Sequence, residues 1–600
     1  MKEKILKHSG IIATLMLILM FCLGLFSMLG DSGTTDEVAH IPSGYTYLHY
    51  QDFRLNPEHP PLIKMMSGLP LQFLDVTFPT EELAWQEANQ WESGWKFIYH
   101  DDNNADQILF WARLPILLLS ILLGIYVYKW TSKVYNKKIA LVALFLFALS
   151  PNIIAHSRLV TTDLGVTATF FIALYYFYKF IKKPSWLNIF LTGIALGIAQ
   201  LVKFSNILLL VYLVILIFAL VLFYKKKIDF KFPLAQCINR EWIKRFYVFF
   251  GSYMIMCIIC FLLVEIVYSL IIFGTPQDML HTVINGSITN VELTWTKDIL
   301  NYMVDISMLK PIGYYLLGLI MVFVRVGGGN TTYFLGETTN QSFWYFYPIS
   351  FLIKTPIATL ILSIFSVIGI IKFSIRKSIN KDSVSFIKRF WRTIGNYINN
   401  NLLEFISLSV IVMFFAVGIQ GNLNIGLRHI LPLYPFLFIL CAKYFFKLFD
   451  KESNIILKIV GILLLIWYAV ANFVAYPSYL AYFNEIAGGN KAGHKYTTDS
   501  NVDWGQDLKR LALYVKENNI EHINIDYFGG SVPKYYIDES KITIWNSNKG
   551  KPSGWFAVST TYYQNSRWYS KTQGEMDYAW LDELEPIEII GGSILVYNLK

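Results

Sequence analysis

Long uninterrupted runs of apolar residues constrain the fold of this chain more than any other feature. Each run is roughly 17 to 25 residues long, the length that an α-helix needs to cross the hydrocarbon core of a bilayer. Of the 600 residues, 54% are hydrophobic and only 16% are charged, a balance that ordinary soluble domains do not have. The sequence therefore predicts a polytopic α-helical membrane protein. The first run is too long for a signal-peptide core, and we expect it to be a retained anchor.

About eleven transmembrane helices are predicted from the lengths of these runs. Their expected ranges are 9–30, 109–128, 139–155, 164–181, 187–203, 206–224, 247–273, 346–371, 403–420, 430–448 and 456–475. A further apolar segment, 311–326, is short. We expect an interfacial or re-entrant helix there, because a full span would move the basic loop that follows 346–371 to the other side.

The net charge of +9 arises from Lys and Arg residues that stand between the spans. If the N-terminus is inside, every inside loop is basic, with clusters at 129–138, 179–183, 225–245, 376–392 and 443–451. This distribution is the positive-inside bias of membrane proteins, so we interpret the charge as topology and not as a nucleic-acid footprint. The orientation places three long segments outside the cytoplasm: 31–108, 274–345 and 476–600.

The chain divides into two predicted domains. Residues 1–475 form the transmembrane domain, with a long first outer loop at 31–108 and a second at 274–345. From residue 476 onward charged and turn residues return and the apolar pattern alternates. We expect a small extracytoplasmic α/β domain with a helix at 507–516, strands at 523–528 and 555–560, and a hairpin at 587–597.

Two acids, Asp36 and Glu37, stand where the first span leaves the membrane. Because Thr34 and Thr35 precede them, capping of a helix N-terminus is one interpretation. The other is a general base, since an acceptor hydroxyl is too weakly acidic to attack unaided.

Reactive side chains also occur close behind, in the run from Arg54 to Leu62. Arg54, Glu58 and His59 stand there among prolines that restrict the backbone. With Asp36, the last two could bind a divalent ion, although one histidine and scattered acids are a weak ligand pattern. No metal site is assigned.

Further charged residues are expected at the outer ends of later spans. Asp163 begins the fourth span, where it could cap the helix or face a partner in the bundle. The positive-inside bias disfavours cations at the outer ends of spans, where we expect Lys203 and the pair Arg428 and His429. Such cations either extend to lipid headgroups or hold the phosphate of a lipid, and we favour phosphate binding. Lys354 stands within a span, where an ionisable group requires a partner.

With these residues taken in order, the chain resembles the bacterial and archaeal members of the protein O-mannosyltransferase family, within the GT-C superfamily of polyprenyl-phosphate-dependent glycosyltransferases. The resemblance rests on the motifs above and on further blocks along most of the chain. These are Ser150 to Asp163, Leu201 to Lys203, Tyr333 to Glu337, Lys354 to Pro356, Asn424 to His429, Phe483 to Gly489 and Asp499 to Leu508.

The resemblance implies a GT-C-like fold and transfer of a sugar from a polyprenyl-phosphate donor to an acceptor hydroxyl at the outer face of the cell membrane. Asp36, with Glu37 adjacent, matches the catalytic acid of the first outer loop, and Asp163 matches the acid of the second. Lys203 and Arg428 match cations near the lipid phosphate. Segment 274–345 is too short for the β-trefoil of eukaryotic members, so mannose is only one candidate sugar. The acceptor is a protein or an envelope glycan.

The same residues support a mechanism by their chemistry. Departure of a lipid phosphate requires fixed positive charge, and attack by a hydroxyl requires a base. One displacement would invert the anomeric configuration, and no cofactor is required. The alternatives are a transporter or flippase for a lipid-linked sugar, and a non-catalytic scaffold. Transporters tend to place charges near the midplane in paired halves, whereas here the charges gather at one face.

Overall fold

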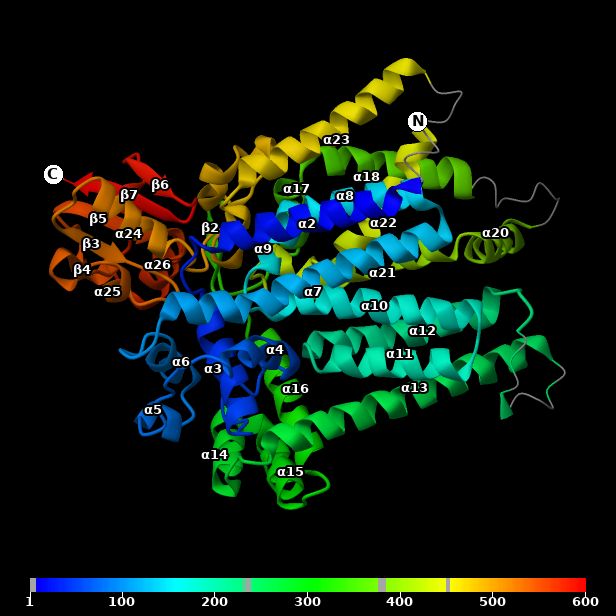
Figure 1. Ribbon diagram of the computed structural model, residues 1–600, viewed down its shortest axis with the longest axis horizontal. Coiled ribbons are helices and arrows are strands. Elements are labelled where there is room, and N and C mark those ends of the chain that lie inside the picture. Colours follow the sequence, from blue (N-terminus) through cyan, green and yellow to red (C-terminus); the bar gives the residue numbers. More distant parts are fainter. Residues whose placement is uncertain are drawn as a thin grey trace.

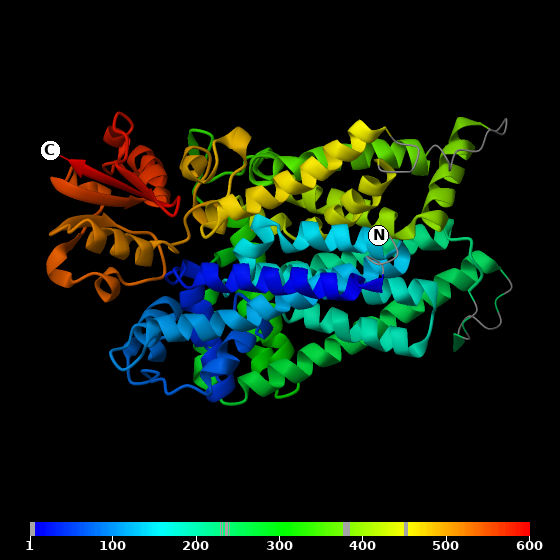
Figure 2. The same cartoon turned by 45° about the horizontal axis from the view of Figure 1, so that its top comes forward.

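The computed structural model describes residues 7–599, except 229, 231, 234–237, 239, 376–384 and 449–453. Parts of the predicted inside loops at 225–245, 376–392 and 443–451 therefore lie outside the described residues. Long helices lie side by side in a bundle, and a small domain that contains a sheet lies at one end of it (Figure 1 and Figure 2). The largest buried apolar cluster fills the bundle, and the small domain has its own clusters.

Eight helices of the described chain are long and apolar enough to cross a membrane, or up to 10 if each of two bent pairs is one span. The eight are α2 (Ser9–Met28), α7 (Ala105–Val134), α10 (Thr162–Lys182), η1 with α12 (Phe204–Asn206 and Ile207–Phe223), α13 (Glu241–Ile272), α16 (Lys310–Gly328), α21 (Leu402–Gln420) and α23 (Ile455–Ala475). The chain is a multi-pass membrane protein, as its composition predicts.

The two bent pairs correspond to the predicted spans 139–155 and 346–371. In the first, α8 (Lys137–Ala148) and α9 (Pro151–Ser157) meet at 62°, and in the second α17 (Phe346–Lys354) and α18 (Ile357–Gly369) meet at 115°. Pro151 and Pro356 stand at the two breaks, where the ring of proline prevents the preceding helix from continuing. The predicted spans 187–203 and 430–448 form shorter helices, α11 (Trp186–Gln200) and α22 (Leu433–Leu448).

Helix α16 contains the apolar segment that we expected to be interfacial or re-entrant. By length and composition it could cross a membrane. In Figure 1, however, it runs across the direction of α7, α10 and α13, beside α14 (Gln277–Ser287) and α15 (Thr294–Asp305). Such an orientation agrees with a helix that lies along the membrane surface.

The first outer segment is far more ordered than the polar loop predicted from sequence. It contains four helices: α3 (Thr35–His49), α4 (Leu62–Leu71), α5 (Leu83–Gln86) and α6 (Gln90–Ile98). Helices α3 and α4 pack backbone to backbone at Gly44 and Gly68. The contact is so close that a Cβ on Gly68 would lie only 2.2 Å from the carbonyl carbon of Gly44. Their contact fixes the direction of α3, whose first turn carries Asp36.

The tail folds as predicted into a small α/β unit. Its five-stranded sheet has the order β4-β3-β5-β7-β6, in which β3 pairs in parallel with β4 and β5, and β7 pairs antiparallel with β5 and β6. The predicted helix and strands correspond to α24, β3, β5 and the β6–β7 hairpin, whereas β4 and α26 were not predicted. The elements are α24 (Leu508–Glu517), β3 (Ile523–Asp526), α25 (Pro533–Tyr536), β4 (Ile542–Ile544), β5 (Gly554–Ser559), α26 (Thr560–Gln573), β6 (Glu588–Ile590) and β7 (Ile594–Leu599).

Smaller elements include the hairpin β1 (Thr332–Phe334) and β2 (Glu337–Thr339), the helix α20 (Phe386–Asn400), and the short turns η5 (Leu427–Ile430), η6 (Tyr479–Ala481) and η9 (Asp499–Asn501).

Candidate active site

Four charged residues that are distant in the sequence meet in one ion-pair network, which we call the acid–cation cluster: Asp36, Asp163, Lys203 and Arg428. Arg428 Nη1 lies 2.8 Å from Asp36 Oδ2 and 3.4 Å from Asp163 Oδ2. Lys203 Nζ lies 2.7 Å from Asp163 Oδ1. Four side chains from separate parts of the chain therefore meet in one place.

Each member of the cluster stands at or next to the first turn of a helix. Asp36 belongs to the first turn of α3 and Asp163 to that of α10. Lys203 directly precedes η1, and Arg428 lies within η5. Helix N-termini favour nearby negative charge, so α3 and α10 stabilise the carboxylates that they present.

The cluster is mostly shielded from solvent, but Asp36 is not. The side chains of Asp163 and Arg428 are 2% and 9% exposed, whereas that of Asp36 is 25% exposed. Burial lowers the pKa of Arg428, but Asp36 and Asp163 more than offset this effect and raise it above its usual value. Arg428 is therefore a permanent cation, and Asp36 is the member that another molecule can approach.

Several buried polar atoms close to the cluster have no hydrogen-bond partner within the described part of the chain. They are Nδ1 of His59, Nδ1 of His156, Nε of Arg428 and Nε2 of His429. Asp163 lies close enough to His59, His156 and His429 to interact with them electrostatically. Because unpaired buried polar groups are costly in a folded protein, such a concentration is typical of a place where a ligand binds.

The imidazoles beside the cluster are held neutral. Burial, followed by the charges of Lys203 and Arg428, lowers the pKa of His429 to about 3. Burial, with His40 and Lys203 as the next causes, holds the pKa of His59 well below its usual value. Each ring can therefore give or accept a hydrogen bond without adding charge to the site.

Glu37 is next to Asp36 but belongs to a different set of contacts. Its fully buried carboxylate accepts hydrogen bonds from Arg113 Nε at 2.8 Å and Arg113 Nη2 at 2.6 Å, and from the backbone of Val160 at 2.9 Å. It also accepts from the backbone N–H and the hydroxyl of Thr34, which completes a capping box at the start of α3. The helix-capping interpretation thus holds for Glu37.

Two arginines extend these contacts into a larger assembly, the support network: Asp31, Glu37, Arg113, Arg158 and Arg510. Arg158 Nη1 lies 2.5 Å from Asp31 Oδ2, and Arg510 Nη2 lies 2.6 Å from Asp31 Oδ1. The network joins α7, the turn after α9 and the tail helix α24 to the segment before α3.

Among the described residues, the hydrogen-bond partners of Arg54 and Glu58 lie inside the first outer segment and outside the acid–cation cluster. Arg54 pairs with Asp52, with 2.6 Å between Nη2 and Oδ2, and stacks on Trp85 at 3.9 Å. Glu58 accepts from Asn56 Nδ2 at 3.3 Å. Lys64, which sequence reasoning missed, organises this run, because its buried Nζ donates to the carbonyl oxygens of Asn56 and His59 at 2.6 and 2.7 Å.

Lys354 meets the expectation that a lysine within a span has a partner, but its partners belong to the tail. Its buried Nζ donates to the carbonyl oxygens of Leu480, Tyr482 and Asn501 at 2.9, 3.0 and 2.5 Å. Lys354 therefore ties the bend between α17 and α18 to the chain that follows the last span.

This part of the tail, residues 479–507, reaches into the cluster itself. The guanidinium of Arg428 stacks on the ring of Trp504 at 4.0 Å, and the Trp504 carbonyl accepts the backbone N–H of Thr35 at 3.1 Å. Asn501 Oδ1 accepts the backbone N–H of Leu427 at 2.9 Å. The sequence analysis identified the run around Trp504 only as a motif of the family. The contact of Trp504 with Arg428 could not be predicted, because the two residues are 76 positions apart in the chain.

Among the described residues, no group of three or more His, Cys, Asp or Glu side chains is arranged to hold a metal ion.

Comparisons with known proteins bear on the fold and on the general class of protein. Residues 106–238 match the family model described as dolichyl-phosphate-mannose-protein mannosyltransferase. The protein O-mannosyltransferase Pmt1–Pmt2 complex of S. cerevisiae, solved with its sugar donor, aligns with 12% identity over 78% of this chain and 90% of that chain, with a TM-score of 0.52. The chain has a GT-C fold. The predicted resemblance to the GT-C protein O-mannosyltransferases is confirmed at this level.

Other solved structures with a GT-C fold align over more of the chain but less closely in shape. The oligosaccharyltransferase AglB of Archaeoglobus fulgidus aligns with 12% identity over 93% of this chain and 71% of that chain, with a TM-score of 0.42. ArnT from Cupriavidus metallidurans aligns with 10% identity over 97% of both chains, with a TM-score of 0.29. The search of curated proteins found no match.

Proposed function

We propose that this protein transfers a sugar from a polyprenyl-phosphate carrier to an acceptor hydroxyl at the outer face of the membrane. The observation that carries the proposal is the meeting of Asp36, Asp163, Lys203 and Arg428, from four separate segments, in one network. The match to a mannosyltransferase family over residues 106–238 and the GT-C fold support the same general reaction. Solved neighbours also include one with a dolichol-phosphate and one with undecaprenyl phosphate.

In the proposed reaction Asp36 is the general base. It is the most exposed acid of the cluster, and its partner is the Nη1 atom of Arg428. When the phosphate of the donor binds Arg428, it competes with Asp36 for that cation, and the carboxylate becomes free to take the proton of the acceptor. The hydroxyl oxygen then attacks the anomeric carbon as the bond to phosphate breaks.

Lys203 and Arg428 stabilise the departing lipid phosphate. Fixed cations of this kind favour the transition state because negative charge grows on the leaving oxygen. Asp163 holds both cations in place, since its two carboxylate oxygens contact one cation each. A single displacement with one base inverts the configuration at the anomeric carbon.

The remaining candidates support the site from outside. We assign Glu37 to the positioning of α3 and Lys354 to the positioning of the tail, because the side chains of both residues make their hydrogen bonds within the protein. Arg54 and Glu58 shape the first outer segment. His59 and His429 remain candidates for hydrogen bonds to the sugar or its phosphate, since each has a free buried nitrogen among the described contacts.

The test is to incubate purified protein with a labelled polyprenyl-phosphate mannose and with glucose and other sugars on the same carrier. Transfer to peptide or glycan hydroxyls, or slow release of free sugar, is expected. Movement of the intact donor across vesicle bilayers without cleavage would instead indicate a flippase and overturn the proposal. Binding of acceptor by the tail, with no change to the donor, would indicate a scaffold.

A further inference from the structure

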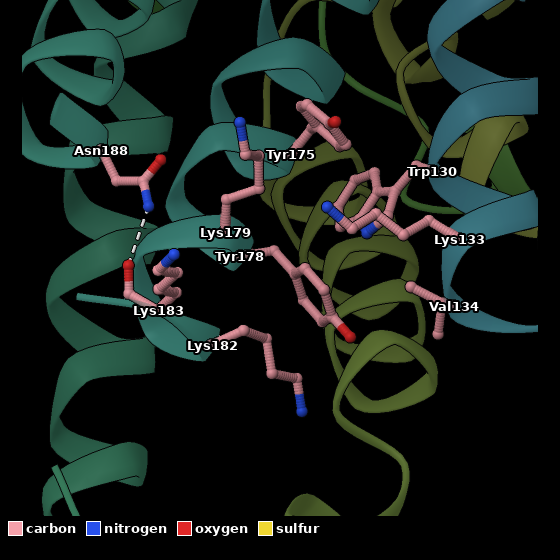
Figure 3. A pocket seen from close by; sticks show the side chains of 9 residues that line it. All are labelled: Trp130, Lys133, Val134, Tyr175, Tyr178, Lys179, Lys182, Lys183 and Asn188. Atoms are coloured by element: carbon pink, nitrogen blue, oxygen red, sulfur yellow. Dashed lines mark hydrogen bonds between the residues drawn. The ribbon is translucent and has the colours of Figure 1, made fainter. Parts of the chain in front are cut away.

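A cavity of about 300 Å³ lies at the end of the bundle away from the tail, where α7 and α10 end and α11 begins (Figure 1 and Figure 3). Most of its wall consists of lysines and aromatic rings. We call it the basic cavity. Its lysines are Lys133, Lys179, Lys182 and Lys183, and its rings are those of Trp130, Tyr175 and Tyr178.

The charge in the basic cavity is of one sign. No acid is among its nine lining residues, and the described chain gives none of the four lysines an acidic partner. Lys179 and Lys182 instead lie over aromatic rings, at 5.3 Å from Tyr176 and 5.4 Å from Tyr178. Lys133, Lys182 and Lys183 are exposed and Lys179 is half-buried. The cavity therefore presents positive charge on several sides of one space, and an anion placed between the lysines would be attracted to all of them.

The positive-inside bias explains why lysines occur at this end of the bundle, but it does not explain why they surround a cavity. Lys225 and Lys227 belong to the same predicted face and are exposed, and neither lines the basic cavity. In the cavity, by contrast, Asn188 Nδ2 donates to the carbonyl oxygen of Lys183 at 2.8 Å, which fixes the turn between α10 and α11 (Figure 3). The lysines are thus presented by a defined backbone around an aromatic wall.

We infer that the basic cavity binds a phosphate group, and that this phosphate belongs to an anionic phospholipid of the leaflet that faces the cytoplasm. The lysines stand at the ends of spans, at the depth of the headgroups, where tyrosine and tryptophan rings are also favoured. Basic pockets between transmembrane helices on this side suit anionic headgroups, and a cavity of this size is at the lower end of ligand sites. The acyl chains remain in the bilayer.

The test is a titration of the detergent-solubilised full chain with dioleoylphosphatidylglycerol, followed by native mass spectrometry. One tightly held lipid per chain is expected, with no comparable binding of dioleoylphosphatidylcholine. The variant Lys179→Gln/Lys183→Gln should bind phosphatidylglycerol roughly thirtyfold more weakly, on the basis of the contribution of each lysine near a charged leaflet. Lys179→Arg/Lys183→Arg should retain it, because the charge is kept.

Lys225→Gln/Lys227→Gln is the matched control, since it removes the same charge from the same face outside the cavity. Equal loss in this control, or unchanged binding in Lys179→Gln/Lys183→Gln, would overturn the inference. Inorganic phosphate distinguishes the source of the ligand: failure of millimolar phosphate to displace the lipid supports a lipid site, and its displacement of the lipid would assign the cavity to a soluble phosphate instead. The readout is lipid binding, so the result is independent of sugar transfer.

Discussion

The acid–cation cluster and the Glu37–Arg113 pair of the support network are built from the same kinds of residue, yet they differ in exposure and in unused hydrogen-bonding capacity. In the support network the side chains of Glu37 and Arg113 are 0% and 2% exposed, and Glu37 has several donors on each oxygen. In the cluster Asp36 is 25% exposed, and Arg428 retains a buried Nε without a partner among the described residues. Two acids that are adjacent in the sequence thus have different surroundings.

The difference teaches how a reactive site can be supported in a membrane protein. Buried ion pairs are costly to form and costly to break, so the pair of Glu37 and Arg113, whose hydrogen bonds are all made, holds the first turn of α3 in one position. The cluster can then leave one carboxylate accessible without losing its geometry. Substitutions that separate these two roles test the comparison directly.

The largest effect is expected for Asp36→Asn. Loss of a general base typically lowers turnover by roughly 10²-fold to 10⁴-fold, while thermal stability should stay near that of the wild type because the side chain keeps its size. Sugar transfer and thermal unfolding in detergent measure the two quantities. Asp102→Asn is the control, since its 74% exposed carboxylate lies in the same outer segment. Near-normal turnover in Asp36→Asn would remove this residue from the chemistry.

Arg113→Ala should show the opposite pattern. Removing one partner leaves Glu37 charged and buried, and such losses cost about 3–5 kcal/mol of stability. We expect a clear drop in the thermal unfolding temperature and in the yield of folded protein. A variant that is as stable as the wild type but inactive would show that the support network takes part in the reaction itself.

Arg428→Ala is expected to weaken use of the lipid donor by roughly one to two orders of magnitude, because charge-assisted contacts to a phosphate are among the stronger hydrogen bonds. The effect should appear mainly in the KM for the donor, and Arg428→Lys should recover only part of it, since lysine lacks the planar fork. A donor KM unchanged in both variants would contradict the assignment.

Trp504→Leu removes the ring under Arg428 and should raise the donor KM about threefold to tenfold, from the usual strength of a cation–π contact. Trp85→Leu is the matched control, because Arg54 stacks on Trp85 at a similar distance of 3.9 Å, away from the cluster. It should lower stability without changing the donor KM. Equal kinetic effects of the two variants would show that stacking at the cluster has no special role.

The smallest effect concerns pH. His429 has a folded pKa of about 3, lowered by burial and by Lys203 and Arg428, whereas in the unfolded chain it is about 6.5. The unfolded state therefore binds a proton that the folded state does not, so this contribution to stability is complete above about pH 6.5 and declines toward pH 3. Between pH 7 and pH 5.5 we expect a loss of about 1 kcal/mol. Thermal unfolding of His429→Gln should show a correspondingly weaker dependence on pH.

Much of the architecture follows from local pattern. Apolar runs predict the spans, and alternation in the tail predicts β3, β5 and the β6–β7 hairpin. The site is partly predictable, because Asp36, Asp163, Lys203 and Arg428 are polar groups at helix ends where isolated charges need a reason. The sequence does not distinguish Asp36 from Glu37, since the distinction depends on Arg113, 76 residues away. A charge within the long apolar helix α7 was the available signal, because such a residue needs a partner.

Other roles could not be inferred from spacing. The sequence predicts that Lys354, a charged residue within a span, requires a partner. In the structure its partners are three carbonyl oxygens of the tail. Sequence pattern has no signal for backbone acceptors brought together by tertiary packing. The helices of the first outer segment were missed for a related reason: they are short and are stabilised by contacts with the bundle and the tail, as between α3 and Trp504.

The stacking of Arg428 on Trp504 also has a consequence for biosynthesis. The carboxylates and cations are all synthesised by residue 428, but the ring that supports Arg428 emerges from the ribosome 76 residues later and must then reach the end of the bundle where Arg428 lies. A nascent polypeptide inserted only through its last span therefore lacks the contact between Arg428 and Trp504. If the cluster performs the proposed reaction, we expect sugar transfer to begin only after the tail has reached it.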